Sequence, residues 1–266
     1  MSSPENSDQA LKEFTFEGDK DTLTVLIPER CSLKAGLTEP SAICSQHRGF
    51  LFLAEVSKVK VNSYVLDPQY GMYVWPSAVV LAQYVWTHRE EIQNHTLLEL
   101  GAGVSLPGVV ASKCGARVIL SDSAELPRCL DNCRRTCTAN GLGGDVQVVG
   151  LTWGQVCPQL LSLPPLDIIM ASDVFYDPED FEDVLVTVSF LLRTNPKAQF
   201  WTTYQERSAD WSLEALLHKW GLNCKYIPLD SFGAHGNYIA RSNLPGNHSI
   251  QMMLISATVG METRTP

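Results

Sequence analysis

From residue 71 onward, short apolar runs alternate with longer amphipathic runs, and this alternation restricts the fold more than any other feature of the sequence. Runs of about four to eight apolar residues indicate strands, and apolar residues at helical spacing over longer stretches indicate helices. Such alternation is typical of a mainly parallel sheet covered on both faces. The predicted strands are 96–100, 117–122, 146–151, 166–173, 198–204, 223–229 and 249–257, and the predicted helices are 75–86, 105–114, 125–140, 179–192 and 210–220.

The two ends of the chain add antiparallel pairing to this pattern. The last two predicted strands, 223–229 and 249–257, are separated by a polar loop without a helical pattern, so we expect an antiparallel edge. Near the N-terminus, two short apolar runs within 11–28 flank the turn-forming residues 18–21, which predicts a β-hairpin. The predicted fold class is therefore α/β: a seven-strand doubly wound sheet with an antiparallel last strand, plus an N-terminal β-hairpin.

The composition limits which ligands and partners we expect. A formal net charge of −9 argues against a strong phosphate-binding face and against an acidic membrane surface, and it is compatible with a basic substrate. The N-terminus carries no apolar signal segment, and no run approaches the length of a membrane helix, about 18 apolar residues. We therefore expect a soluble, intracellular protein with no membrane partner.

The eight cysteines and six histidines do not have the spacing of metal ligands. Cys129, Cys133 and Cys137 recur every four residues, so they share one face of a predicted helix, where buried thiols are ordinary. A zinc site would call for a Cys-x-x-Cys pair or neighbouring histidines. We expect no metal cofactor.

A glycine-rich turn follows the first strand of the alternating region. Gly101 and Gly103 come directly after the strand 96–100, and their missing side chains let a ligand approach the backbone. A dinucleotide-binding turn would have a third glycine where Leu106 stands, and the Lys-Ser/Thr pair of a phosphate-binding loop does not follow. Glu99, two residues before the glycines, would attract a cationic ligand and repel a diphosphate.

Candidate ligand contacts also stand at the ends of the next three strands. Asp122 ends the second strand and can accept both ribose hydroxyls of an adenosine. Trp153 follows the third strand, where its ring can stack on adenine, and Ala171 stands at the tip of the fourth. Each feature alone has an ordinary alternative: a tight turn, a helix cap or a core tryptophan. Because ligands of doubly wound sheets bind at the carboxyl ends of the strands, the four together predict S-adenosylmethionine.

Five segments together resemble the methyltransferase-like proteins of the seven-strand, S-adenosylmethionine-dependent class. These segments are 71–86, 97–108, 118–123, 151–154 and 171–183. The resemblance implies a Rossmann-like sheet, a monomer, and methylation of protein side chains. It implies cofactor contacts from Trp75, at the methionine end, and from the further residues Gly101, Ala102, Gly103, Asp122, Trp153, Ala171 and Tyr176.

The resemblance leaves the methyl acceptor open between two side chains. Most members of the family modify lysine, whereas the branch that this chain resembles implies arginine of histone H3. Composition and spacing do not distinguish the two. A catalytically weak S-adenosylmethionine-binding module for chaperones or transcription factors is an alternative, and a nicotinamide-dependent oxidoreductase is another, although the third glycine and an obvious catalytic set are missing. A chain of this size can pass nuclear pores, so both nucleus and cytoplasm are expected.

The segment after the fourth strand carries the candidate catalytic residues. Asp173 is expected to orient the substrate and Tyr176 to close the pocket. The acids of 177–183 would surround the substrate mouth, or they form only an acidic first helical turn. Nucleic-acid methylation is not expected, because residues 173–176 read DVFY instead of an N/D-P-P-Y motif and there is no basic stripe.

The chain departs from the family pattern in its N-terminal part. Residues 30–64 lie between two segments that would be nearly continuous in relatives, and we interpret them as an inserted segment that loops out or stays flexible. The predicted organisation is a flexible tail at 1–10, N-terminal strands at 11–29, the inserted segment 30–64, the methyltransferase domain 65–257 and a flexible tail at 258–266.

Overall fold

The computed structural model describes residues 10–28, 70–207 and 213–258. The predicted inserted segment 30–64 lies outside these ranges, as do the predicted tails apart from Ala10 and Thr258. The strands are β1 (Leu11–Glu17), β2 (Thr22–Pro28), β3 (Thr96–Glu99), β4 (Arg117–Asp122), β5 (Gln147–Gly150), β6 (Ile168–Ser172), β7 (Gln199–Gln205), β8 (Leu222–Ile227) and β9 (Ile250–Ala257). The helices are η2 (Tyr70–Met72), α2 (Pro76–Thr87), α3 (Leu106–Lys113), α4 (Pro127–Ala139), α5 (Pro158–Leu161), α6 (Phe181–Thr194), α7 (Leu213–Lys219) and η3 (Leu229–Phe232).

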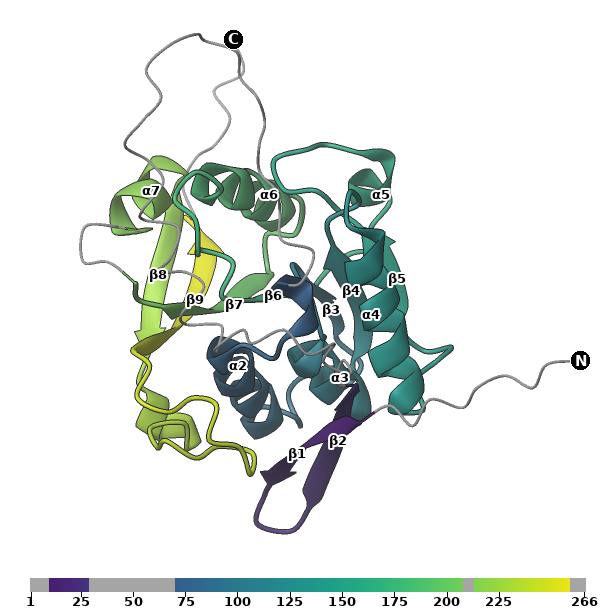
Figure 1. Ribbon diagram of the computed structural model, residues 1–266. Coiled ribbons are helices and arrows are strands. Elements are labelled where there is room, and N and C mark those ends of the chain that lie inside the picture. The colour runs from purple at the N-terminus through teal and green to yellow at the C-terminus, as the bar shows by residue number, and fades with distance from the viewer. Residues whose placement is uncertain (1–9, 29–69, 208–212, 259–266) are drawn as a thin grey trace, which may run out of the picture.

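The main sheet has seven strands in the order β5-β4-β3-β6-β7-β9-β8, and β1 and β2 form a separate antiparallel pair (Figure 1). Neighbouring strands from β5 to β7 are parallel, and β9 is antiparallel to both β7 and β8. The doubly wound α/β sheet, its antiparallel last strand and the N-terminal hairpin are thus confirmed. The strand order reverses beside β3, which puts the switch point next to the glycine turn.

The predicted antiparallel edge is the β8–β9 pair, and the outer strand of this pair is the one that comes earlier in the chain. β9 lies between β7 and β8, and β8 is the edge strand. Burial accounts for this order: four of the eight residues of β9 are buried and none is exposed, whereas three of the six residues of β8 are exposed, Tyr226 among them. An apolar strand gains more from two neighbours than a polar one does.

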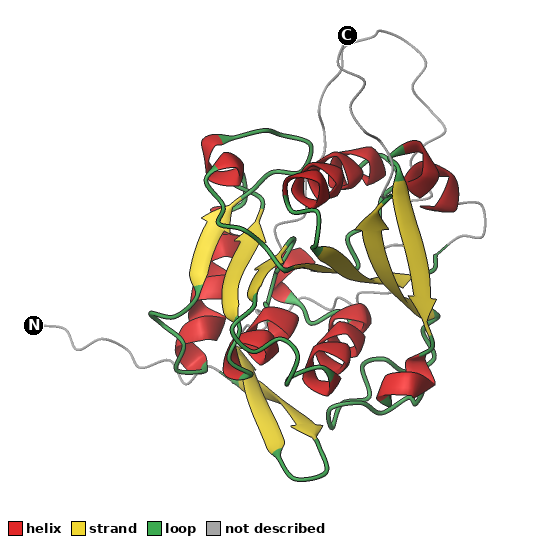
Figure 2. Cartoon of the chain, turned by 180° about the vertical axis from the view of Figure 1, so that it is seen from behind, coloured by secondary structure: helices red, strands yellow, loops and turns green. Residues whose placement is uncertain are grey.

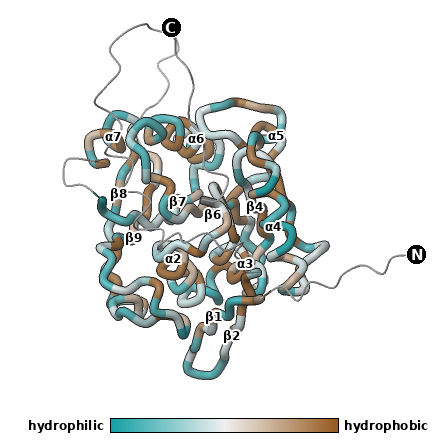
Figure 3. Tube along the Cα trace, viewed as in Figure 1, coloured by the Kyte–Doolittle hydropathy of each residue, from teal (hydrophilic) through white to brown (hydrophobic). Residues whose placement is uncertain are grey.

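Side chains of the central strands divide between two apolar cores, one on each face of the sheet. In β6, Ile168 and Met170 face α2 and α3, and Ile169 and Ala171 face α6. This alternation is the period of two that a strand imposes. Figure 2 shows helices on both sides of the sheet, and Figure 3 shows apolar residues gathered on the strands and inner helices, with a hydrophilic tip on the β1–β2 hairpin.

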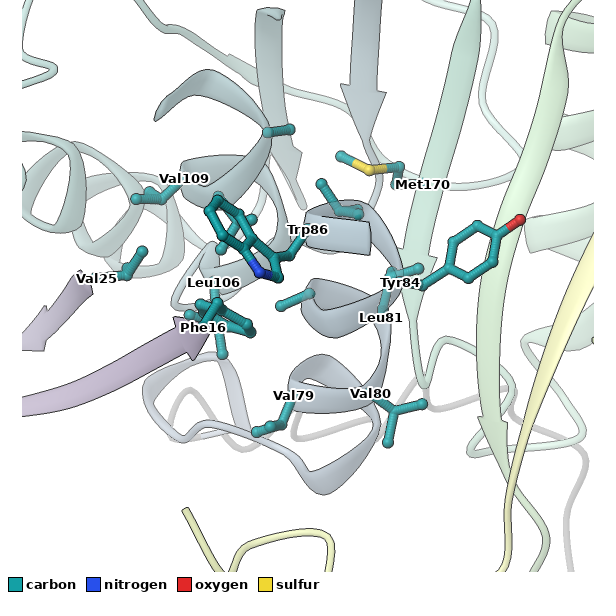
Figure 4. Packing of buried hydrophobic residues seen from close by; sticks show 14 of the residues in the cluster. Phe16, Val25, Val79, Val80, Leu81, Tyr84, Trp86, Leu106, Val109 and Met170 are labelled. Atoms are coloured by element: carbon teal, nitrogen blue, oxygen red, sulfur yellow. The ribbon is translucent and has the colours of Figure 1, made fainter. Parts of the chain in front are cut away.

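The hairpin packs against the helices that carry the site. Trp86 of α2 lies among Phe16 and Val25 of the hairpin and Leu106 and Val109 of α3 (Figure 4). Asn140, just after α4, accepts a hydrogen bond from the Leu26 N–H at 2.9 Å and donates one to the Leu26 carbonyl at 2.6 Å. The hairpin therefore links the C-terminal end of α2 to α3 and α4. Among the helices of the described residues, none has the length and apolar content needed to cross a bilayer.

Candidate active site

A cavity of about 870 Å³ opens at the carboxyl ends of β3 to β7. Its walls come from the segment before α2, from the glycine turn, from the residues after β4, β5 and β6, and from the end of β7. This is the position at which a doubly wound sheet binds its ligand. Of the predicted site residues, those that line the cavity are Trp75, Gly101, Ala102, Gly103, Asp122, Trp153, Asp173 and Tyr176.

Asp122 connects the end of β4 to the glycine turn. Its carboxylate accepts hydrogen bonds from the Gly103 N–H and the Ser123 N–H, both at 2.8 Å. Burial raises the pKa of Asp122, and the two N–H donors oppose that rise. A carboxylate has about four acceptor sites, so Asp122 keeps capacity for the hydroxyl groups of a ligand.

Backbone conformation requires both glycines of the turn, and a close protein neighbour also requires Gly101. Gly101 and Gly103 have φ values of 61° and 51°, which glycine adopts without strain. A Cβ atom on residue 101 would lie 2.9 Å from the Trp153 ring, and one on residue 103 would lie 3.4 Å from the backbone of Gly71. The turn is thus covered by Trp153 on one side and by η2 on the other.

Asn132 of α4 holds η2 against this turn. Its buried amide group donates hydrogen bonds to the carbonyls of Gly71, at 3.0 Å, and Gly103, at 3.4 Å. Gly71 itself has no room for a side chain, because a Cβ atom there would lie 2.6 Å from the Cys129 sulfur. These contacts fix the segment that leads into Trp75, the residue directly before α2.

Glu99 does not line the cavity, so its predicted contact with the ligand is wrong for this structure. Alternation along β3 turns its side chain to the α3 face of the sheet, where it is fully buried and accepts a hydrogen bond from the Gly108 N–H at 2.9 Å. Burial, and secondarily the nearby Asp122 carboxylate, raises the pKa of Glu99 to about 8 against the opposing Gly108 hydrogen bond.

In a dinucleotide-binding turn, a glycine at position 106 would allow the helix to pack closely on the sheet. In this chain Gly108 allows that close packing. A Cβ atom on residue 108 would collide with the Glu99 carboxylate and with Leu120 of β4, so only glycine lets α3 approach the sheet this closely. One feature of the sequence pointed to this role. Gly108 stands in the first turn of the predicted helix 105–114, where glycine is unfavourable for helix formation.

Ala171 also lies off the cavity wall. It is fully buried in β6, and its side chain packs in the apolar core on the α6 side of the sheet. The next two residues, Ser172 and Asp173, line the cavity instead.

Asp173 is paired with Arg207, a residue that sequence reasoning did not identify. The two Arg207 amino groups donate to the two Asp173 carboxylate oxygens at 2.9 and 2.6 Å. The side chains are only 16% and 4% exposed, so this is an almost buried, two-pronged ion pair at the cavity wall. Nothing in the sequence pattern connects two residues that are 34 positions apart.

Four further acidic side chains line the cavity, and they define what we call its acidic mouth. Glu125, Asp180, Asp183 and Glu206 line it together with Tyr176. The pKa of Asp180 is raised by burial and then by the neighbouring acids Asp177, Asp183 and Glu179, and a hydrogen bond from Tyr176 opposes the rise. A wall of this charge favours a cationic side chain over an anionic one.

The cysteines of α4 are buried thiols. Cys129 lines the cavity, and burial raises its pKa to about 12, so it is protonated at neutral pH. Within residues 10–28, 70–207 and 213–258, no three His, Cys, Asp or Glu side chains are grouped as metal ligands.

The sequence predicts that Trp153 stacks on the adenine of S-adenosylmethionine. Removing the Trp153 ring should therefore weaken binding of S-adenosylhomocysteine, the product that this ligand leaves after methyl transfer. Because stacking of an aromatic ring on a base contributes roughly 1–3 kcal/mol, we expect Trp153→Ala to raise the dissociation constant about tenfold or more. Isothermal titration measures it. Trp220→Ala is the matched control, since Trp220 bonds Glu182 outside the cavity. If Trp153→Ala and the control bind S-adenosylhomocysteine with equal affinity, Trp153 does not contact this ligand.

The pKa of Glu99 predicts how stability depends on pH. Because the folded pKa of Glu99, about 8, exceeds the ordinary value of 4.5, the folded state holds a proton between these pH values that the unfolded state has lost. Wild-type stability should therefore fall as pH rises from about 5 to 8, by a few kcal/mol. Glu99→Gln cannot lose this proton, so urea unfolding should give it a flatter profile. Parallel profiles would contradict the assignment.

The residues that line the cavity fit S-adenosylmethionine. This cofactor has ribose hydroxyls, a planar adenine and a sulfonium, and it has no phosphate. Asp122 supplies acceptors for hydroxyls, Trp153 supplies a ring face, and the acidic lining suits a cationic ligand. Trp75 and the glycine turn would complete the site around the methionine end.

Comparisons with known proteins agree with this site. A family model described as lysine methyltransferase matches residues 54–214. The chain is 62% identical over 237 residues to a histone-arginine methyltransferase METTL23 of Mus musculus, covering 86% of this chain and 92% of that protein. It is 63% identical over 192 residues to a protein of the same name from Xenopus laevis, covering 72% and 82%.

Among solved structures, the CcbJ methyltransferase of Streptomyces caelestis matches with a TM-score of 0.50 at 13% identity, covering 69% of this chain and 90% of that one. At this identity the likeness shows the fold alone, and the fold is that of a methyltransferase. The family match covers more than half of the chain, and the relatives are covered over most of their length. The chain therefore belongs to this lysine methyltransferase family, and it is a protein methyltransferase whose cofactor is S-adenosylmethionine.

Proposed function

We propose that this protein methylates the guanidinium group of an arginine side chain in histone H3. The observation that carries the proposal is the two-pronged pairing of Asp173 with a guanidinium inside the cavity. A planar fork matches a carboxylate in this way, and an ammonium does not. The names of the relatives from mouse and frog, histone-arginine methyltransferase, support arginine of a histone as the acceptor.

The residues of the cavity would position the acceptor and handle its proton. When bound, S-adenosylmethionine supplies a methyl group on a sulfonium, and the sulfur leaves as a neutral thioether that needs no acid. Asp173 holds the acceptor guanidinium, and Trp75 and Trp153 reduce the access of water. Asp180, whose pKa is raised, accepts the proton that the guanidinium loses after attack, and Tyr176 orients this carboxylate.

Lysine is the second candidate acceptor, because the matching family model is described as lysine methyltransferase. A lysine must lose its proton before attack, whereas a guanidinium held by carboxylates can lose it late. The acidic mouth would keep a lysine protonated, which favours arginine.

We further propose a monomer that works in both nucleus and cytoplasm, where both a histone and chaperone or transcription-factor partners are accessible.

Transfer of labelled methyl from S-adenosylmethionine identifies the acceptor. Wild-type protein is incubated with purified histones and separately with a methyltransferase-depleted lysate, with Asp122→Ala as the inactive control. We expect a labelled histone H3 band that the variant does not give. Label on another protein would overturn histone H3 as the acceptor, and cofactor binding without label on any protein would favour a non-catalytic binding module.

A further inference from the structure

The acceptor carboxylate in the cavity already holds a guanidinium of the protein itself. Arg207 stands just beyond β7, and its side chain reaches across to Asp173 at the end of β6. The guanidinium makes both prongs of the pair, at 2.9 and 2.6 Å, and one amino group also donates to the Gln205 carbonyl at 3.3 Å. Both residues line the cavity.

Asp173 has little freedom to turn toward another ligand. Its backbone has a φ of 57°, its N–H donates to the Thr203 carbonyl at 2.8 Å, and its carboxylate also accepts from the Gln205 N–H at 3.3 Å. Because a single carboxylate edge offers one two-pronged site, a second guanidinium cannot pair in the same way while Arg207 is there.

We propose that Arg207 is a specificity-determining residue that occupies the acceptor subsite, and that a substrate guanidinium binds by exchange with it. This inference rests on the proposed function. Exchange with arginine restores both charged hydrogen bonds on Asp173, whereas a lysine ammonium is a point charge that restores one. Glu206, adjacent in sequence and also on the cavity wall, is the carboxylate that we expect to receive the displaced Arg207 guanidinium. Arg207 thus makes the subsite selective for guanidinium over ammonium.

The exchange has a measurable consequence for binding. Arg207 competes with the acceptor for Asp173. The apparent affinity for the acceptor is therefore the intrinsic affinity multiplied by the fraction of molecules in which the subsite is open. Removing the Arg207 guanidinium should therefore tighten the binding of an arginine side chain by about tenfold or more, since one charged hydrogen bond alone corresponds to roughly that factor. It should also leave the buried Asp173 carboxylate without a cationic partner, which destabilises the fold until a guanidinium is supplied.

Thermal melting of the full chain tests this without turnover. The probes are Nα-acetyl-arginine methylamide and its citrulline and lysine counterparts, applied to wild type, Arg207→Met and Arg241→Met. Arg241 pairs with Glu17 on the surface and is the matched control. We expect Arg207→Met to melt below wild type and to regain several degrees with the arginine probe. The lysine probe should give less and the citrulline probe nothing. Wild type and Arg241→Met should respond alike to the arginine probe, with a smaller shift than Arg207→Met.

Three results would overturn the inference. Arg207→Met could show no shift with the arginine probe, or an equal shift with the citrulline probe. Alternatively, its affinity for S-adenosylhomocysteine could fall tenfold, which would assign Arg207 to the cofactor. If Arg207→Met does not fold, Arg207→Lys retains the charge without the fork, and it should bind the arginine probe several-fold more tightly than wild type. If Arg207→Lys binds the arginine probe no more tightly than wild type, the exchange is also rejected.

The proposed function and this inference fail separately. A wild-type enzyme that labels only lysine would overturn arginine methylation, while the probe shifts would still report whether Asp173 accepts a guanidinium. Methylated arginine without any probe shift would retain the function and reject the exchange with Arg207.

Discussion

Replacing Asp122 by alanine is expected to abolish useful binding of S-adenosylhomocysteine, with a loss of about a hundredfold or more. Asp122 accepts from the Gly103 and Ser123 N–H groups and lines the cavity. Alanine would remove the acceptors for the ribose hydroxyls, each charged hydrogen bond contributing about 1.5–3 kcal/mol, and would leave the Gly103 N–H of the turn without its carboxylate. Isothermal titration of the full chain measures the loss.

Two variants make this result specific to the site. Asp131→Ala removes an exposed carboxylate on α4, outside the cavity, and should bind like wild type. Asp122→Asn keeps one oxygen for the Gly103 N–H, so it should lose less affinity than Asp122→Ala. Binding by Asp122→Ala within a few-fold of wild type, in a protein that unfolds cooperatively, would show that the cofactor does not use the end of β4.

Replacing Gly108 by alanine is expected to lower the free energy of unfolding by about 3 kcal/mol, the upper range for overpacking a core. At an exposed helix position the same change would stabilise the helix by about 1 kcal/mol, so the sign here reverses the propensity rule. The added methyl group would collide with the Glu99 carboxylate and with Leu120, both fully buried. Urea unfolding measures the difference.

Gly144→Ala is the control for Gly108→Ala. A Cβ atom on residue 144 meets nothing within 4 Å, so its effect should stay within about 0.5 kcal/mol. If Gly108→Ala is as stable as this control, α3 can move away from the sheet, and the close approach is not what requires glycine at position 108.

The fold was predictable because its pattern is local. Alternating strands and amphipathic helices in the sequence correspond to the observed elements, and the boundaries differ by a few residues. The place of β9 was not predictable in the same way. Pairing partners in a sheet depend on which strand gains more from burial, and that comparison between β8 and β9 requires the assembled structure.

The site was predictable where residues follow directly from strand ends. Gly101 and Trp153 come shortly after a strand and Asp122 ends one, and parallel strands bring their carboxyl ends together. Glu99 was misassigned because a short buried strand gives no sign of which face each residue takes. The pairing of Asp173 with Arg207 needed the three-dimensional structure, since it joins the ends of two neighbouring strands.

The chemical identity of the methylated residue tests the account most directly. Protein labelled by the wild-type enzyme is hydrolysed completely, and the released amino acids are separated and counted for label. The pairing of Asp173 with a guanidinium predicts that the label is in methylated arginine and that Asp122→Ala gives none. Label recovered in methylated lysine would contradict the proposal, because it would mean that the cavity accepts an ammonium.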